Sequence, residues 1–225
     1  MSVTLDRSQV AQLVRAALQS QQSHSTNGTH TRPEIAPKLV VNVSARHCHV
    51  TQTDLERLFG PGHKLTPHKW LYQDGFFAAE ETVTLIGPRR RMIPNLRILG
   101  PCRDHSQVEL AFTDAILLGL DIPVRKSGDH RDSPGCYLLG PHGMVELPTG
   151  VIRHERHVDM GPGAADYYGV KDGDRINLRV ESSCTIVFED LLCRLNPSSK
   201  LGVHLDTDEG NACDYAHATN FELFK

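Results

Sequence analysis

The stretch LVVNVSARHCHV, residues 39–50, joins a β-strand pattern to two histidines. Residues 39–44 are mostly apolar and β-branched, which favours a strand. His47 and His49 follow at a spacing of two, and side chains at i and i+2 of a strand share one face. Two imidazoles on one face can bind the same metal ion at about 2.0–2.1 Å. The alternative is an exposed histidine pair at a strand edge.

Short β-patterned runs dominate the chain beyond this stretch. They are punctuated by Gly, Pro and Asp, and the clearest lie at residues 82–86, 97–99, 108–112, 137–139, 175–180 and 185–189. Short helices are predicted only at residues 51–59 and 113–120. Many short strands with few helices indicate a mainly β protein built from small β-barrels with short capping α-helices.

The N-terminal region has a different pattern. Apolar side chains recur at helical spacing over residues 4–20, which predicts an amphipathic helix within residues 1–21. A flexible linker rich in Ser, Thr, Asn, Gly and Pro is predicted at residues 22–37. Such a helix can dock into a partner's groove through its apolar face, or it can pack on its own domain.

Composition excludes several classes of protein. The 225 residues carry 24 Lys and Arg against 27 Asp and Glu, so no nucleic-acid partner is expected. No apolar run approaches the ~20 residues of a membrane helix, so no membrane partner is expected either. The basic run at residues 89–91 has two interpretations: it binds a small polyanion, or it is a solvent-exposed edge of the protein. The six cysteines form no C-x-x-C pair, which favours a reducing, intracellular location over a disulfide framework.

An internal echo of the histidine motif occurs later in the chain. Residues 46–50 read RHCHV, and residues 156–160 read RHVDM. His157 and Asp159 therefore repeat the spacing of two, and a carboxylate binds zinc at about 2.0–2.2 Å. Two related halves would bring these segments to face one another across a shared cleft.

Further candidate ligands lie outside the echo. Glu109 interrupts an apolar strand, which requires an ion pair or a metal ion, and His204 lies in another alternating segment. His154 is out of phase with His157 by one residue, so we expect it around the site or at the surface. The candidate metal ligands are His47, His49, Glu109, His157, Asp159 and His204. They are too many for one tetrahedral site and fit two adjacent metal ions with open positions, which is the catalytic pattern.

Two other side chains bear on the chemistry. Arg103 follows a strand and a Gly-Pro turn, where a planar guanidinium suits bidentate phosphate binding, although an ordinary surface arginine looks the same. Cys48 alternates to the face opposite the histidines, so it is not expected to be a ligand.

Three separated motifs resemble the PduL-type phosphotransacylases, the phosphate propanoyltransferase family of bacterial microcompartments. They are residues 42–50, residues 100–103 with 107–109, and residues 204–212, and the resemblance covers roughly residues 38–225. It implies two small β-barrel domains, at about 38–120 and 121–225, between which strands can be exchanged. It also implies an enzyme with two zinc ions, or other divalent metals, that interconverts propionyl-CoA or acetyl-CoA plus phosphate with acyl phosphate plus CoA.

The resemblance assigns roles residue by residue. His47 and His49, with Glu109 close by, would hold one zinc ion, and residue 159 with His157 and His204 the other. Arg103 would be the catalytic residue that grips phosphate. Contacts to CoA are expected from Lys69, Arg97 and Asn211. The family pattern has His where this chain has Asp159, so weaker phosphate binding, a different metal or low activity becomes possible.

The start of the chain resembles the encapsulation peptides of such enzymes. This implies a bacterial microcompartment within the cytoplasm, shell or core proteins as partners of the helix, and a role in propanediol degradation. A homodimer is expected. Two other functions stay open: a metal-dependent thioester or phosphate hydrolase, and a metal-stabilised microcompartment component without catalytic activity.

Overall fold

The computed structural model describes residues 36–225, which lie within one compact unit. The predicted helix at residues 1–21 lies outside the described residues, as does the predicted linker except for residues 36 and 37. Within the described part of the chain, no helix is long and apolar enough to span a membrane.

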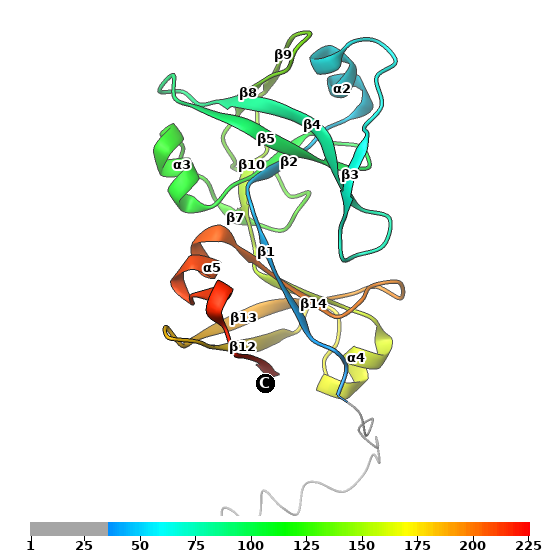
Figure 1. Ribbon diagram of the computed structural model, residues 1–225, viewed down its shortest axis with the longest axis vertical. Helices are drawn as coiled ribbons and strands as arrows, with labels where there is room; N and C mark the ends of the chain where they lie inside the picture. Colours follow the sequence, from blue (N-terminus) through cyan, green and yellow to red (C-terminus); the bar gives the residue numbers. More distant parts are fainter. Residues whose placement is uncertain (1–35) are drawn as a thin grey trace, which may run out of the picture. The chain divides into compact units, whose positions relative to one another are not determined.

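A nine-stranded sheet contains the first histidine motif (Figure 1). Its strands run in the order β7-β10-β6-β2-β5-β4-β8-β9, and β3 pairs with β4. The strands are β2 (His47–His49), β3 (Pro67–Trp70), β4 (Phe77–Ile86), β5 (Met92–Gly100), β6 (Gln107–Glu109), β7 (Val124–Arg125), β8 (Cys136–Leu139), β9 (Met144–Leu147) and β10 (Val151–His154).

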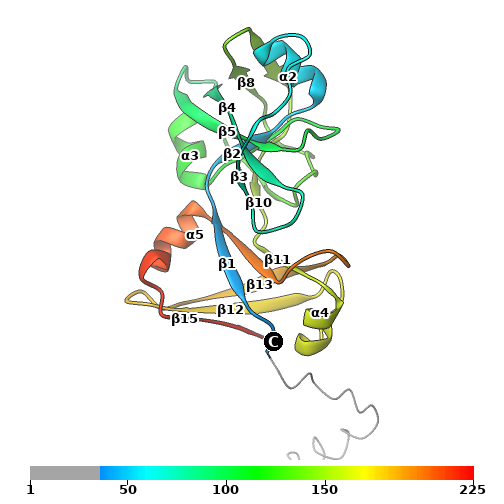
Figure 2. The same cartoon turned by 45° about the vertical axis from the view of Figure 1, so that its right-hand side comes forward.

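A six-stranded sheet contains the echo of that motif (Figure 2). Its order is β1-β14-β11-β13-β12-β15. The strands are β1 (Val40–Ser44), β11 (His157–Met160), β12 (Arg175–Glu181), β13 (Ile186–Leu195), β14 (Gly202–Asp206) and β15 (Asn220–Phe224). Each sheet is curled into a half-barrel.

Short helices connect the strands. They are α2 (Gln52–Phe59), α3 (Phe112–Leu118), α4 (Pro162–Tyr168), α5 (Thr207–Ala212) and the 3₁₀ helix η1 (Tyr215–His217). Helix α2 begins where the Thr51 hydroxyl accepts a hydrogen bond from the Asp54 amide at 3.0 Å. It packs beside β9 (Figure 1). Helix α4 ends at Gly169, whose φ of 63° is the left-handed conformation that glycine tolerates best.

The structure confirms a mainly β protein with short helices. The helices predicted at 51–59 and 113–120 correspond to α2 and α3, and every predicted strand overlaps an observed one. The run at 108–112 ends early, because α3 begins at Phe112. Strand β1 lies in the sheet of the second motif, and β7 to β10 lie in that of the first. The division into domains at residue 120 stays a prediction.

Two hydrophobic clusters fix the direction in which the motif side chains point. Cys48 and Val50 are buried with Leu55 and Leu58 of α2 in the core of the nine-stranded sheet. The core of the six-stranded sheet includes Val158 between the two echo residues. Since a slip of one residue would reverse every side chain, burial of Cys48 and Val158 turns the polar residues of both motifs to the other face.

Candidate metal centre

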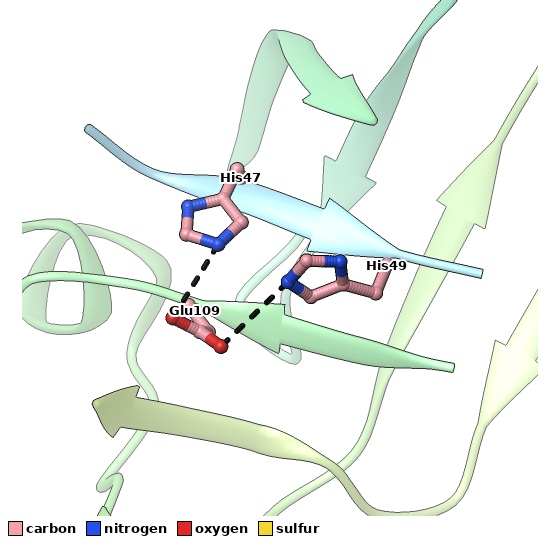
Figure 3. Close-up of side chains that lie close together, drawn as sticks. All are labelled: His47, His49 and Glu109. Atoms are coloured by element: carbon pink, nitrogen blue, oxygen red, sulfur yellow. Dashed lines mark ion pairs between the residues drawn. The ribbon is translucent and has the colours of Figure 1, made fainter. Parts of the chain in front are cut away.

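The first group of candidate ligands comes from two adjacent strands. His47 and His49 lie on β2, and Glu109 lies on β6, directly opposite His47 in antiparallel register. Figure 3 shows both imidazoles pointing toward the carboxylate. The distances are 3.4 Å from His47 Nε2 to Glu109 Oε2 and 3.8 Å from His49 Nε2 to Glu109 Oε1. All three side chains are buried, and their ligand atoms lie within 4.8 Å of one another.

The second group repeats this arrangement in the other sheet. His157 and Asp159 lie on β11, and His204 lies opposite His157 on the antiparallel strand β14. The two rings stack with centroids 4.8 Å apart. Asp159 Oδ2 is 3.4 Å from His204 Nε2 and 3.9 Å from His157 Nε2. These three ligand atoms also lie within 4.8 Å of one another.

The two motifs that resemble each other in sequence also share a side-chain geometry. In each motif, Nδ1 of the first histidine faces the carbonyl oxygen two residues earlier, at 2.8 Å for His47 and Ala45 and at 2.7 Å for His157 and Glu155. A carbonyl oxygen only accepts, so Nδ1 carries the hydrogen and Nε2 keeps a lone pair. This is the arrangement in which proteins orient histidine toward a metal ion.

Burial keeps three of the four histidines in the neutral form that binds metal. Burial and the charge of His47 lower the pKa of His49 to about 3. Burial, offset in part by Asp159, lowers the pKa of His204 to about 4. Burial and the charge of His204 hold the pKa of His157 well below its ordinary value.

His47 and Glu109 each favour the charged form of the other. Burial lowers the pKa of His47, but the charge of Glu109 and a hydrogen bond to it outweigh this, so the pKa is raised. Burial would raise the pKa of Glu109, yet the charge of His47 holds that pKa well below its ordinary value. A cation bound here would compete with a proton for His47 Nε2.

The two groups lie within electrostatic reach of each other and of Arg103. The charge of Glu109 acts on the pKa of His204 across the two sheets. The pKa of Arg103 is lowered, because burial and the charge of Arg194 outweigh the opposite effect of Glu109. Arg194 in turn lies beside the second group, with Nε 3.5 Å from Asp159 Oδ1. Arg103 therefore lies near both groups of candidate ligands, and its role in phosphate binding stays a prediction.

Sequence reasoning missed a buried network behind Glu109. Gln107 Nε2 donates to Glu109 Oε1 at 2.6 Å, and the Ser127 hydroxyl donates to the same oxygen at 2.8 Å. Arg103 Nη1 donates to Ser127 Oγ at 2.9 Å. The Gln107 oxygen accepts from the Gly128 amide at 2.7 Å, which fixes the orientation of the amide. Gln107 lies two residues before Glu109 on the same strand, so strand alternation could have placed both side chains on one face. No such pattern in the sequence pointed to Ser127.

The residues expected to contact CoA lie at different places. Arg97 is on β5, in register with His47, and its Nη1 donates to the carbonyl of Ala79 at 2.7 Å. Lys69 on β3 and Asn211 in α5 are exposed. Neither makes a hydrogen bond or ion pair with the candidate ligands in the described part of the chain. Their role in CoA binding stays a prediction.

The donor set fits divalent metal ions such as zinc. Two imidazoles and one carboxylate form a familiar catalytic zinc set that leaves a position open. His204 Nε2 is buried and lacks a hydrogen-bond partner among residues 36–225, and a bound cation would supply one. Cys48 is not part of either group, because it lies in the core and burial raises its thiol pKa.

Comparison with known proteins is consistent with this geometry. A family model described as phosphate propanoyltransferase matches residues 40–216. A phosphate propanoyltransferase of Planctopirus limnophila is 55% identical, over 98% of this chain and 92% of its own length. One from Thermotoga maritima is 48% identical over 78% of this chain and 84% of its own. One from Salmonella typhimurium is 43% identical over 79% and 85%.

Proposed function

Because the chain belongs to the phosphate propanoyltransferase family, we propose that it transfers a short acyl group between CoA and phosphate. The substrates are propionyl-CoA or acetyl-CoA and inorganic phosphate, and the products are acyl phosphate and CoA. The family match over residues 40–216 carries this proposal, and the two groups of ligand atoms supply a place for the chemistry.

Two divalent cations, which we take to be zinc, would be held in this centre. His47, His49 and Glu109 would hold one, and His157, Asp159 and His204 the other. When bound, such cations act as Lewis acids toward the thioester carbonyl, the thiolate or a phosphate oxygen. The protein contributes neutral imidazoles with fixed tautomers, and carboxylates that face them.

Arg103 would orient the phosphate. Its Nη1 is held by Ser127, and no other hydrogen bond of its guanidinium is found within the described residues. The remaining N–H groups are free to bind two phosphate oxygens in the planar geometry that suits them. Holding phosphate beside the thioester replaces a bimolecular encounter by a positioned one, which lowers the entropic part of the barrier.

The transfer then needs no acyl-enzyme intermediate. A phosphate oxygen attacks the carbonyl carbon, the C–S bond breaks, and a C–O bond to phosphate forms. The proton of hydrogenphosphate ends on the thiol of CoA. Cys48 is a poor nucleophile for a two-step route, because its side chain is wholly buried among apolar residues and burial raises its pKa.

CoA would lie along β5 and α5. Arg97 is the strongest of the three proposed contacts, because its register position is opposite His47. Lys69 and Asn211 are exposed, so the phosphate groups of CoA can reach both.

A thiol assay separates this function from its rivals. The protein is incubated with propionyl-CoA, with and without phosphate, and free thiol and acyl phosphate are measured. Phosphate-dependent thiol release with formation of acyl phosphate supports the transferase. Thiol release without phosphate would indicate a thioester hydrolase, and no release from metal-loaded protein would indicate a non-catalytic component.

The cellular setting is a separate proposal that depends on the sequence of residues 1–37. We propose that the start of the chain targets the enzyme to a microcompartment through shell or core proteins, and that the enzyme is a homodimer. Residues 1–25 fused to a fluorescent protein should give punctate fluorescence in cells that carry compartments. Diffuse fluorescence would contradict the targeting, and light scattering of the purified protein tests the dimer.

A further inference from the structure

His154, at the end of β10, is a buried histidine with no assigned role. The sequence places it around the site or at the surface, and the structure places it inside, with 4% of the residue exposed. Its Nε2 is buried and has no hydrogen-bond partner within residues 36–225. An unpaired buried polar atom destabilises the fold, so such an atom in a polar surrounding calls for a ligand.

The tautomer of His154 decides which kind of ligand it can bind. Its Nδ1 lies 3.3 Å from the carbonyl oxygen of Glu155, which His157 Nδ1 also contacts at 2.7 Å. The carbonyl only accepts, so in the neutral ring Nδ1 carries the hydrogen and Nε2 presents a lone pair. A lone pair repels a phosphate oxygen and attracts a cation. The arrangement is that of His47 and His157, both candidate metal ligands.

The register of the strands places His154 on the face of the metal centre. Strand β10 runs parallel to β6, with Ile152 opposite Glu109, and His154 shares the face of Ile152 because it lies two residues further on. Its ring meets that of His157 edge to face, with centroids 5.7 Å apart. The strand register and the ring contact together place the His154 ring near both groups of ligands.

We propose that His154 is a further metal-binding side chain, which donates Nε2 to the cation held by His157, Asp159 and His204. His154 Nε2 lies outside the compact group of ligand atoms, so a rotation of the side chain brings it to the cation. Asp159 turns Oδ2 toward the two histidines, while its Oδ1 lies 3.5 Å from Arg194 Nε, so one ligand position remains for His154. Three imidazoles and one carboxylate would complete a tetrahedral set at this cation, and the cation of His47, His49 and Glu109 would keep the open position.

This inference rests on the proposed metal centre and is tested by metal binding rather than turnover. Metal is removed by dialysis against a chelator, and the apoprotein is titrated with Zn²⁺ in competition with a chromogenic chelator. His154→Leu keeps a buried side chain of similar size, and His154→Gln keeps polarity without the imidazole. His68→Ala is the control, because His68 is an exposed histidine on β3.

Wild-type protein and His68→Ala should bind two ions. Both His154 variants should weaken one of the two binding events by about 10–100-fold and leave the other unchanged. Titration with Co²⁺ should show the same difference in the visible absorption of one site. The His154→Leu apoprotein should melt no lower than wild-type apoprotein, since the substitution removes an unpaired polar atom.

Three results would overturn the inference in distinguishable ways. If wild-type protein binds two ions and both His154 variants bind them with affinities within twofold of wild type, His154 is not a ligand. If wild-type protein binds no ion, the proposed metal centre itself fails. A His154→Leu apoprotein that melts well below wild type, together with normal metal affinity in His154→Gln, would show a structural role instead.

Discussion

Ser127→Ala should weaken metal binding and phosphate binding together, although Ser127 belongs to neither group of ligands. The hydroxyl donates to Glu109 Oε1 at 2.8 Å and accepts from Arg103 Nη1 at 2.9 Å and from Gln107 Nε2 at 3.0 Å. One oxygen atom thus ties a candidate metal ligand to the residue proposed to grip phosphate. Alanine leaves Glu109 with one fewer donor and Arg103 without its anchor.

The size of each effect follows from these contacts. Loss of a hydrogen bond that orients a metal ligand costs about 10–100-fold in metal affinity. At about 1.4 kcal/mol per tenfold, this is roughly 1.4–2.8 kcal/mol at the site of His47, His49 and Glu109. Arg103 must then be ordered by phosphate itself, at about 0.5–1.5 kcal/mol for one long side chain. The Michaelis constant for phosphate should rise roughly 2–10-fold, and that for acyl-CoA should stay unchanged.

The assay combines Zn²⁺ competition with the two Michaelis constants. Ser198→Ala is the matched control, because its hydroxyl lies on the exposed turn with Asn196, at 2.9 Å from the amide oxygen. If the constants for phosphate and acyl-CoA rise equally, the effect is general damage to the fold. If neither metal affinity nor the phosphate constant changes, the network does not link Arg103 to the metal centre.

Three further predictions concern other parts of the fold. Cys48→Ala should keep turnover near the wild-type value and cost about 1 kcal/mol in thermal stability, because Cys48 fills the core; complete loss of turnover would revive an acyl-cysteine route. Arg153→Met should cost about 3–5 kcal/mol in urea unfolding, since it leaves the buried Asp206 without its ion pair and Glu209 with Arg156 alone, at 3.6 Å. Arg179→Met at the exposed pair with Glu222 should cost under about 1 kcal/mol. Glu81→Gln should destabilise the protein at pH 7 and less so toward acid. Burial raises the pKa of Glu81, but hydrogen bonds from Thr66 and His63 lower it more, so the net pKa is lowered. The carboxylate therefore stabilises the fold above its unfolded pKa, and this stabilisation is lost as the pH falls through its folded pKa. An equal difference in urea stability between wild type and Glu81→Gln at pH 3 and pH 7 would contradict the last of these.

The parts of the site that could be predicted from the sequence are those fixed by strand alternation. The spacing of His47 and His49 needs only the period of a strand, and Cys48 between them marks the buried face. Glu109 was found because a charge among apolar strand residues needs a partner. Ser127 could not be found in this way, because it reaches Glu109 from a loop 18 residues further along the chain.

His154 shows how the same argument fails when a strand bends. The sequence treated residues 154–159 as one run, in which His154 and His157 fall on opposite faces. In the structure β10 ends at His154, β11 begins at His157, and the two residues between them change direction from one sheet to the other. The alternation of faces therefore starts anew at β11, and the rings of His154 and His157 come into contact. Alternation predicts faces only within one uninterrupted strand.

Asp159 is the departure from the family pattern, and nearby positive charge offsets the negative charge that it adds. A divalent cation held by neutral imidazoles and one carboxylate keeps a single positive charge, and Asp159 gives the second group one carboxylate, as Glu109 gives the first. Two such centres would together match the double negative charge of hydrogenphosphate. Arg194, 3.5 Å from Asp159, and Arg103 add positive charge around the same space. The extra carboxylate therefore lowers the attraction for phosphate without reversing it, so reduced affinity is a more reasonable expectation than loss of activity.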